Sequence, residues 1–220
     1  GYRENGYLPE AFVNMLALLG WNPGTEQEIF TMEELIQAFS LERVGKSGSR
    51  FDPEKTKWFN QQWLHRTPSD KLAEMFLPIL KEKNISASMD YVVKVCDLIK
   101  ERAVFVQDLW TNGYYFFEAP QSYEPKDVKK RWKDNAAEKI QATLAFLENE
   151  TDYTSKVLEE KTMAFIAKNE YNVGQICNCL RLAVVGACMG AHLFDIFEMI
   201  GKEETLKRVH KALKTITIEE

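Results

Sequence analysis

The sequence has few of the residues from which enzyme sites are commonly built. It contains four cysteines and three histidines in 220 residues. It has neither a phosphate-binding P-loop pattern nor a dinucleotide-binding fingerprint. Cys177 and Cys179 lack a second cysteine pair and a histidine at zinc-binding spacing, so ordinary thiols explain them best. The sequence therefore predicts no catalytic residue and no metal site.

An excess of positive charge and a long apolar run are also missing. The formal net charge is -5, so any binding of nucleic acid has to come from local basic patches. The longest uncharged stretch, residues 182–194, is shorter than the ~20 residues of a membrane-spanning helix. Without a secretory signal, the cysteines are expected to be reduced thiols of a cytoplasmic protein. The start, without Met and in mid-pattern, favours a piece of a longer chain.

Apolar residues at helical spacing are present almost throughout the chain. They predict helices over residues 9–20, 31–39, 53–66, 71–83, 88–109, 127–149, 155–169, 173–186, 193–201 and 204–216. No convincing alternation of polar and apolar residues predicts a strand. The fold class is therefore predicted to be all-α, with a small helical module followed by a larger helical bundle or cage.

Positive charge is densest between residues 43 and 66, where a Gly- and Ser-rich loop leads into a helix. Asp52 is a suitable N-cap for this helix and Pro53 a suitable first residue. Lysines on such a stretch usually form a solvated surface. A flexible loop with Lys46 and Arg50 ahead of a helix N-terminus is also suited to phosphate contact. Both interpretations stay open on spacing alone.

Two arginines border apolar segments. Arg102 ends an amphipathic pattern, and Arg181 flanks the apolar face of the predicted helix 173–186, just before the small-residue loop 186–191. Either arginine could simply pair with a glutamate. An arginine against an apolar wall can also hydrogen-bond the edge of a splayed-out RNA base, because the wall excludes water.

Several motifs occur in a fixed order along the chain. They are GYLPEA at 6–11, ALLGW at 17–21, ERV at 42–44, FDPEKTKW at 51–58, LRLAVVG at 180–186 and LFDIFEMIGKEETLKRV at 193–209. Over about 60 residues this order closely resembles the segment that follows the catalytic domain in class I glutamyl-tRNA synthetases. The likeness continues more weakly to the C-terminus, where the last two motifs are similar to the family's LRxAxxG and the segment after it.

The resemblance implies a role in tRNA recognition. The family activates glutamate with ATP and magnesium and transfers it to its tRNA, but the HIGH-like and KMSKS-like motifs of that chemistry are missing from this sequence. We therefore expect a catalytically silent fragment without a cofactor of its own. Its expected partner is the glutamate-specific tRNA, with no DNA and no membrane, and we expect a monomer.

The resemblance also implies domains and site residues. Residues 1–67 correspond to a stem-contact module, and residues 68–220 to an all-helical anticodon-binding domain in two subdomains that divide near 120–150. Position by position, Arg102 matches the arginine that reads the last anticodon base. The residues that match the surface against the anticodon bases are Arg181, Gly190, Ala191 and Leu193. The residues suited to the tRNA stem are Lys46, Ser47 and Lys55.

Two alternatives of other classes remain. One is an all-helical protein-interaction module without RNA binding, which an exposed apolar patch without a nearby arginine pair would favour. The other is a self-sufficient enzyme that uses a cysteine or a histidine. A cysteine within hydrogen-bond distance of a histidine in a cleft would favour that enzyme.

Overall fold

The computed structural model describes residues 1–216, which consist of α-helices, short 3-10 helices and connecting loops. In this part of the chain the only β pairing is an isolated antiparallel bridge between Trp21 and Val44. The predicted all-α class is confirmed. The chain divides into two compact units, Gly1–Asn112 and Gly113–Glu220, and each is described by itself.

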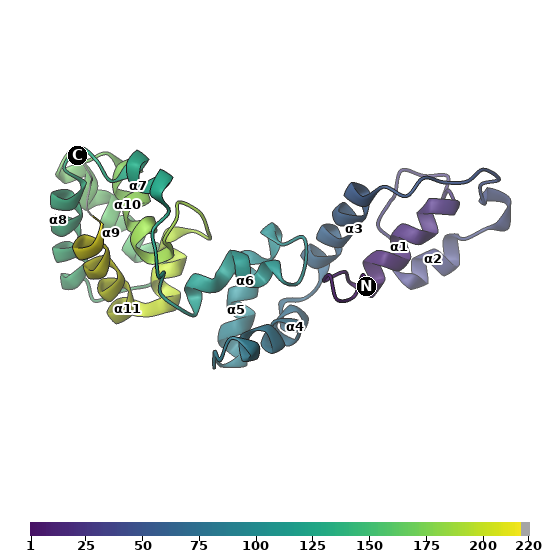
Figure 1. Cartoon of the computed structure of the whole chain (residues 1–220), viewed down its shortest axis with the longest axis horizontal. Helices are drawn as coiled ribbons and strands as arrows, with labels where there is room; N and C mark the ends of the chain where they lie inside the picture. Colours follow the sequence, from purple (N-terminus) through teal and green to yellow (C-terminus); the bar gives the residue numbers. More distant parts are fainter. Residues whose placement is uncertain (217–220) are drawn as a thin grey trace. The chain divides into compact units, whose positions relative to one another are not determined.

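The first unit contains six helices within the described residues, drawn from purple to teal in Figure 1. They are α1 (Pro9–Gly20), α2 (Met32–Ala38), α3 (Pro53–Arg66), α4 (Ser69–Glu82), α5 (Met89–Ile99) and α6 (Asp108–Gly113), with the 3-10 helices η1 (Leu41–Arg43) and η2 (Lys100–Arg102). Helix α1 packs on α3, and α4 packs on α5. The predicted domain boundary at residue 67 falls between α3 and α4 and stays a prediction.

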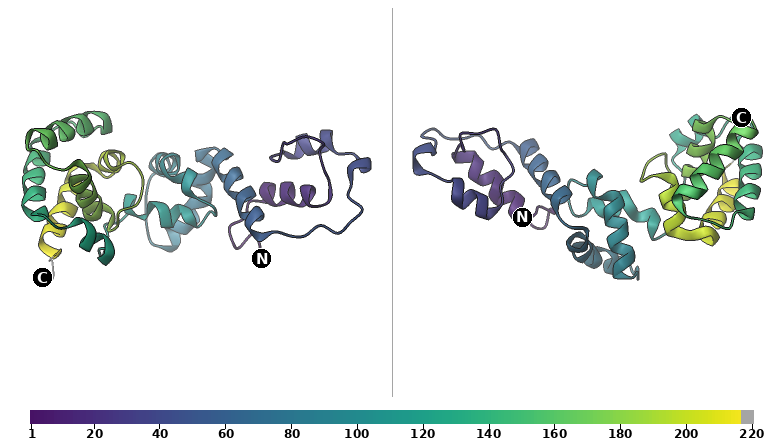
Figure 2. Two further views of the ribbon diagram at one scale, coloured as in Figure 1. Left: turned by 90° about the horizontal axis from the view of Figure 1, so that it is seen from above. Right: turned by 180° about the vertical axis from the view of Figure 1, so that it is seen from behind.

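The second unit is built on α10 and α11, which pack against each other and both contact α8 and α9. Two further views show these helices gathered around one another (Figure 2). The elements are η3 (Tyr114–Phe116), α7 (Pro125–Arg131), α8 (Ala136–Asn149), α9 (Ser155–Lys168), α10 (Val173–Val185) and α11 (Leu193–Thr215). The predicted division near 120–150 also stays a prediction.

Helix starts in the first unit follow from short capping sequences. The Thr31 hydroxyl accepts a hydrogen bond from the Glu34 amide at 3.2 Å, which caps α2. The Asp52 carboxylate accepts one from the Glu54 amide at 3.0 Å, and Pro53 occupies the first turn of α3. Both predicted starts are confirmed, because these side chains supply acceptors for amides that have no partner within the helix.

The predicted helix over residues 88–109 is wrong in its second half. The chain leaves the helix after η2 because polar side chains bind the turn instead. The Asp108 carboxylate accepts hydrogen bonds from the amides of Val104 and Phe105 at 3.0 and 2.9 Å. The buried Asn60 side chain donates to the Val104 carbonyl oxygen at 2.6 Å. These hydrogen bonds, one of them from a residue 44 positions away, outweigh the continuing helical pattern.

The predicted helix over residues 127–149 is also two helices, α7 and α8. Asp134 and Asn135 adopt left-handed backbone conformations, with φ of 54° and 59°. Asp and Asn tolerate this region better than other residues with a Cβ atom. Gln175 fixes the turn from the side, because its amide group donates to the carbonyl oxygens of Lys133 and Asp134. A break at Gly201, predicted between residues 201 and 204, is confirmed by its φ of 83° inside α11.

Buried asparagines stabilise the first unit. The Asn14 side chain, which is 0% exposed, donates to the Glu28 carbonyl oxygen at 2.9 Å and accepts from the Phe30 amide at 3.0 Å. Asn60 accepts from the Leu8 amide at 2.8 Å. Because a buried amide group is costly unless it is hydrogen-bonded, these contacts fix the extended segments against α1 and α3.

None of the helices within residues 1–216 combines the length and the apolar character needed to cross a lipid bilayer.

Candidate nucleic-acid interface

The loop of residues 186–192 joins α10 to α11 and needs glycine at two positions. Gly186 ends α10 in a left-handed conformation with φ of 89°, and its amide donates to the Leu182 carbonyl oxygen at 2.8 Å. Gly190 has φ of 111°, and a Cβ atom there would lie 2.9 Å from the Tyr115 hydroxyl oxygen. The small residues thus allow a backbone path that larger residues would obstruct.

Arg181 holds this loop from within α10. Its Nη1 atom donates to the carbonyl oxygens of Met189 and Ala191 at 3.2 and 2.6 Å. The side chain is half-buried against the apolar residues of the helix. An arginine suits this position because its planar group can bind two oxygens at once. In the structure, the guanidinium of Arg181 therefore binds the backbone of the predicted binding loop itself.

Three further side chains fasten the same loop. The Tyr115 hydroxyl oxygen accepts a hydrogen bond from the Ala191 amide at 2.8 Å. The Asp127 carboxylate, on α7, accepts one from the Cys188 amide at 2.8 Å. The Tyr114 hydroxyl donates to the last carbonyl oxygen of α10. Burial raises the pKa of Tyr114, so it remains a hydrogen-bond donor over the ordinary pH range.

These anchors were missed by sequence reasoning. Tyr115 and Asp127 lie 76 and 61 residues from their partners in the loop. No local motif connects residues at such separations. The only available signal was the aromatic-rich stretch around Tyr115, which lies in the predicted break between two helices.

The predicted anticodon-contact residues of the loop lie together but mostly inside the fold. Ala191 is 5% exposed and Leu193 is 3% exposed, and Gly190 is buried. His192, which lies between them, is exposed, and its Nε2 atom is 2.9 Å from a Glu159 carboxylate oxygen. The buried residues set the position of the loop, whereas His192 belongs to its outer surface.

Arg102 belongs to the first unit. It is exposed at the end of η2, and its carbonyl oxygen accepts a hydrogen bond from the Asn112 side chain at 3.1 Å. The structure thus fixes the backbone at Arg102 through the end of α6, while Arg102 is exposed at the surface.

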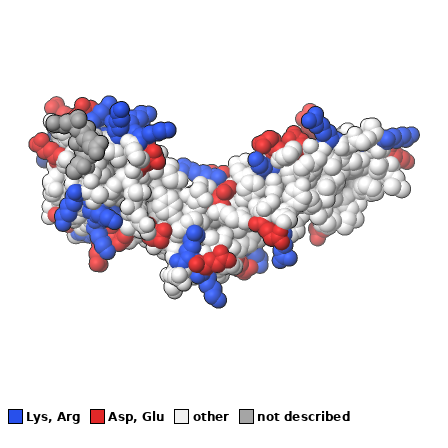
Figure 3. Space-filling model, in the orientation of Figure 1, with Lys and Arg blue, Asp and Glu red and all other residues white. Residues whose placement is uncertain are grey.

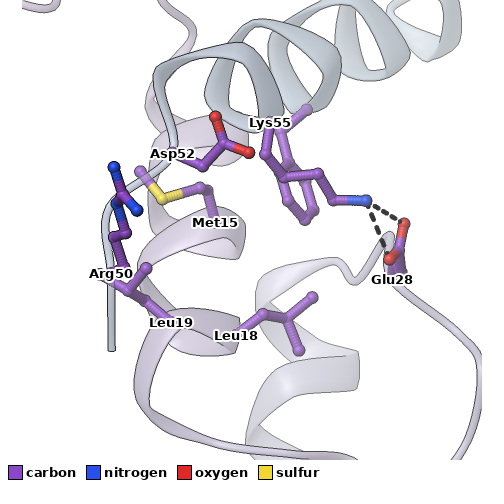
Figure 4. Close-up of a pocket in the computed structure, with 8 residues that line it drawn as sticks. Met15, Leu18, Leu19, Glu28, Arg50, Asp52 and Lys55 are labelled. Atoms are coloured by element: carbon purple, nitrogen blue, oxygen red, sulfur yellow. Dashed lines mark hydrogen bonds and ion pairs between the residues drawn. The ribbon is translucent and has the colours of Figure 1, made fainter. Parts of the chain in front are cut away.

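The predicted stem-contact residues lie at the other end of the same unit. Lys46 and Ser47 are exposed in the loop before α3. The Lys55 ammonium lies 2.8 and 2.9 Å from the carboxylate oxygens of Glu28, and 4.1 Å above the Trp58 ring centre. Lys55 and Arg50 border a pocket of about 220 Å³ whose floor is apolar (Figure 4). Lys55 is therefore held in place, unlike Lys46.

The cysteines have the properties of structural thiols. Burial raises the pKa of Cys96 and of Cys179 to about 12, and it raises those of Cys177 and Cys188 as well. A raised pKa suppresses the thiolate, which is the nucleophilic form. Among residues 1–216, no three or more potential metal ligands of the His, Cys, Asp and Glu types come together.

Two of the histidines are paired with carboxylates. His192 lies beside Glu159, and the Nε2 atom of His210 is 3.0 Å from a Glu148 carboxylate oxygen. Neither arrangement is the Cys–His pair that nucleophilic catalysis needs.

Comparison with known proteins identifies the family. The family described as "Anticodon binding domain" matches residues 71–213. The chain belongs to the anticodon-binding domain family. A second family, described as "tRNA synthetases class I (E and Q), catalytic domain", matches residues 1–58. The anticodon-binding domain therefore includes Arg102, the loop 186–192 and all of the side chains that anchor the loop.

Similar full-length proteins are glutamate–tRNA ligases. The chain is 49% identical over 216 residues to that of Flavobacterium psychrophilum and 48% identical to that of Christiangramia forsetii. These matches cover 98% of the chain but only 43% of each relative, so the chain spans less than half their length. A crystal structure of a glutamate tRNA ligase from Elizabethkingia meningosepticum, in complex with its amino acid, matches with a TM-score of 0.93 and 40% identity. It covers 99% of the chain and 43% of that structure. The resemblance found in the sequence is confirmed.

Proposed function

We propose that this chain recognises tRNA as part of a glutamyl-tRNA synthetase. The observation that carries the proposal is the match of residues 71–213 to the anticodon-binding domain family, within which Arg181 orders the loop 186–192. In this proposal the second unit presents that loop to the anticodon bases, and Arg102 reads the last base. Lys46, Ser47 and Lys55 contact the tRNA stem.

In the proposed mechanism, different contacts place the tRNA on the protein and select which tRNA is bound. Contacts to phosphate oxygens fix where the tRNA lies, and contacts to base edges select which tRNA is accepted. Arg102 suits the second task because an exposed guanidinium can form two parallel hydrogen bonds to a base edge. The ligation of glutamate, which uses ATP and Mg²⁺, belongs in this proposal to the catalytic part of a cytoplasmic parent enzyme. The present chain contributes recognition only.

A binding experiment tests the proposal. The chain is titrated with glutamate tRNA, and with the same tRNA changed only in its anticodon, at 50 and 200 mM salt. We expect tighter binding of the native anticodon at both concentrations, together with a loss of affinity at higher salt that is shared by both RNAs. Arg181→Ala should reduce the difference between the RNAs, because the loop loses two of its backbone contacts.

The matched control is Arg3→Ala, which removes the same charge from an exposed position outside the anticodon-binding domain. It should keep the preference for the native anticodon. Equal binding of the two RNAs by the unaltered chain would refute the proposal and favour a helical protein-interaction module.

A further inference from the structure

The second unit carries a cluster of lysine and arginine side chains near the loop 186–192. None of these cations has been assigned a role above. Between residues 126 and 139 there are six lysine or arginine side chains and three acidic ones, although the whole chain has a net charge of -5. Positively charged side chains gather over the part of this unit where α7 lies (Figure 3). Local positive charge of this kind is where an acidic protein can hold a polyanion.

Part of this cluster surrounds a pocket of about 410 Å³ between α7, α8 and α10. The residues that line it are Lys130, Arg131, Lys133, Asp134, Lys139, Asn172 and Gln175. We call it the basic pocket. Four cations thus face one carboxylate, with two side-chain amides completing the wall.

The cations of the basic pocket lack carboxylate partners. Within residues 1–216, no carboxylate oxygen lies within 4.0 Å of the charged nitrogens of these four side chains. By contrast, Lys55, Lys57 and Lys161 each pair with a glutamate. The Nε atom of Arg131 is buried and has no hydrogen-bond partner in the described structure. A buried donor without an acceptor costs free energy, and an anion in the pocket would supply the missing acceptor.

Helix stability alone does not explain this charge. Basic residues in the last turn of α7 do favour its C-terminus. Lys133 and Lys139, however, lie beyond α7, and Lys139 is in the first turn of α8. The pocket wall is also fixed in shape, since Gln175 accepts a hydrogen bond from Lys139 at 3.0 Å and holds the left-handed turn at Asp134 and Asn135.

The basic pocket is connected to the loop 186–192 through α7. Asp127, one turn before Arg131, binds the Cys188 amide of the loop, and the charge of Arg131 acts on the Cys188 thiol. An RNA whose bases contact the loop would therefore find the basic pocket one turn further along α7. We propose that the basic pocket binds backbone phosphate groups of the RNA whose bases contact the loop 186–192. This inference rests on the proposed function and adds a sequence-independent contact to it.

The test uses the chain and an RNA hairpin with the anticodon stem and loop of glutamate tRNA. The variant Lys130→Gln/Lys133→Gln removes two charges from exposed positions of the pocket. The control Lys156→Gln/Lys168→Gln removes two exposed lysines of α9 that also lack carboxylate partners. We expect the pocket variant to lose on the order of tenfold in affinity at moderate salt. The slope of log K against log[salt] should fall by roughly 1.4 to 1.8 in magnitude, as for two phosphate contacts.

The ratio of affinities for the native hairpin and one with a changed anticodon should be the same in the variant as in the unaltered chain, because phosphate contacts carry no base information. If the unaltered chain prefers the native anticodon but the variant binds like the control, the basic pocket is not a phosphate site and the proposed function stands. If the variant loses affinity but the unaltered chain has no anticodon preference, the proposed function fails and the phosphate site stands.

A second measurement does not depend on RNA. The side-chain amide signals of Asn172 and Gln175, followed by NMR in the ¹⁵N-labelled chain, should shift on titration with inorganic pyrophosphate. The shifts should be lost in Lys130→Gln/Lys133→Gln and kept in the α9 control. Signals that stay in place at millimolar pyrophosphate would overturn the assignment of the pocket to phosphate groups.

Discussion

The guanidinium of Arg208 and the carbonyl oxygen of Tyr115 are 2.7 Å apart, although 93 residues separate them in the chain. The same Nη1 atom donates to the Val184 carbonyl oxygen at 2.8 Å, and Nε pairs with Glu204 at 2.9 Å. Arg208 is only 3% exposed. One buried cation thus joins η3, which anchors the loop 186–192, to α10 and α11, the two helices that the loop connects.

Substitution of Arg208 should destabilise the second unit. Arg208→Met keeps much of the side-chain length but leaves the buried carbonyl oxygens of Tyr115 and Val184 without their donor. We expect the free energy of unfolding to fall by about 2 to 4 kcal/mol. Urea unfolding followed by circular dichroism measures it. Lys207→Met, at the exposed neighbouring position, is the control; equal midpoints for the two variants would contradict the role given to Arg208.

A methyl group at Gly190 should displace the loop. In Gly190→Ala the new Cβ atom would lie 2.9 Å from the Tyr115 hydroxyl oxygen, at a φ of 111° that L-residues rarely adopt. We expect a loss of about 1 to 3 kcal/mol in stability and weaker anticodon preference. Gly48→Ala adds the same methyl group where no atom lies within 4 Å and should change neither property. An anticodon preference that survives Gly190→Ala would show that RNA does not require this backbone path.

Arg102→Gln should relax the selection of the last anticodon base. If the guanidinium forms two hydrogen bonds to that base, its loss lowers discrimination by ~1 to 3 kcal/mol. Binding of hairpins that differ only in the last anticodon base, measured by fluorescence anisotropy, gives this difference directly. Arg3→Gln removes an equal charge from the surface of the same unit. Unchanged relative affinities in Arg102→Gln would assign the selection to other residues.

Removing the partner of Lys55 should strengthen stem contact. Glu28→Gln breaks the ion pair whose ammonium and carboxylate atoms lie 2.8 Å apart, and it frees Lys55 for a phosphate. Because both side chains are more than 40% exposed, the cost in stability should stay below about 1 kcal/mol. Affinity for full-length tRNA should rise at low salt, and more than in Glu42→Gln, which removes an exposed charge from η1. Identical gains in both variants would mean that only net charge changed.

The cysteines should differ sharply in reactivity between the folded and unfolded chain. Burial holds the pKa of Cys96 and Cys179 at about 12, against an ordinary value of 9.0. In the folded chain at pH 8, we expect iodoacetamide to label these two slowest, and all four cysteines at similar rates in urea. Mass spectrometry locates the labels. Since folding raises these pKa values, their stabilising contribution is complete below pH 9 and is lost as the pH rises toward 12. Fast labelling of Cys179 in the folded chain would contradict its burial.

The helical class and the capped helix starts were predictable because they depend on local sequence. Thr31 and Asp52 accept hydrogen bonds from amides within one turn, Pro53 occupies the first turn of its helix, and Gly201 breaks a helix by its own backbone conformation. The breaks near residues 103 and 134 were not predictable in this way. Besides local bonds such as those of Asp108, they depend on Asn60 and Gln175, whose partners lie 44 and about 40 residues away.

The candidate site could be located from the sequence, but its geometry could not. The family motif located Arg181 and the small residues of the loop, and the resemblance placed the arginine against the anticodon bases, which stays a prediction. Its bonds to the Met189 and Ala191 carbonyl oxygens became visible only once α10 and the loop were placed together. The basic pocket was outside the motifs altogether, because its walls come from three helices.

The anchoring of the loop 186–192 has a thermodynamic consequence. Side chains from η3, α7 and α10 fix its backbone before any ligand arrives. A surface ordered in advance loses little conformational entropy on association, so more of each contact's free energy appears as affinity. A binding loop with two glycines would otherwise lose more conformational entropy on ordering than most segments.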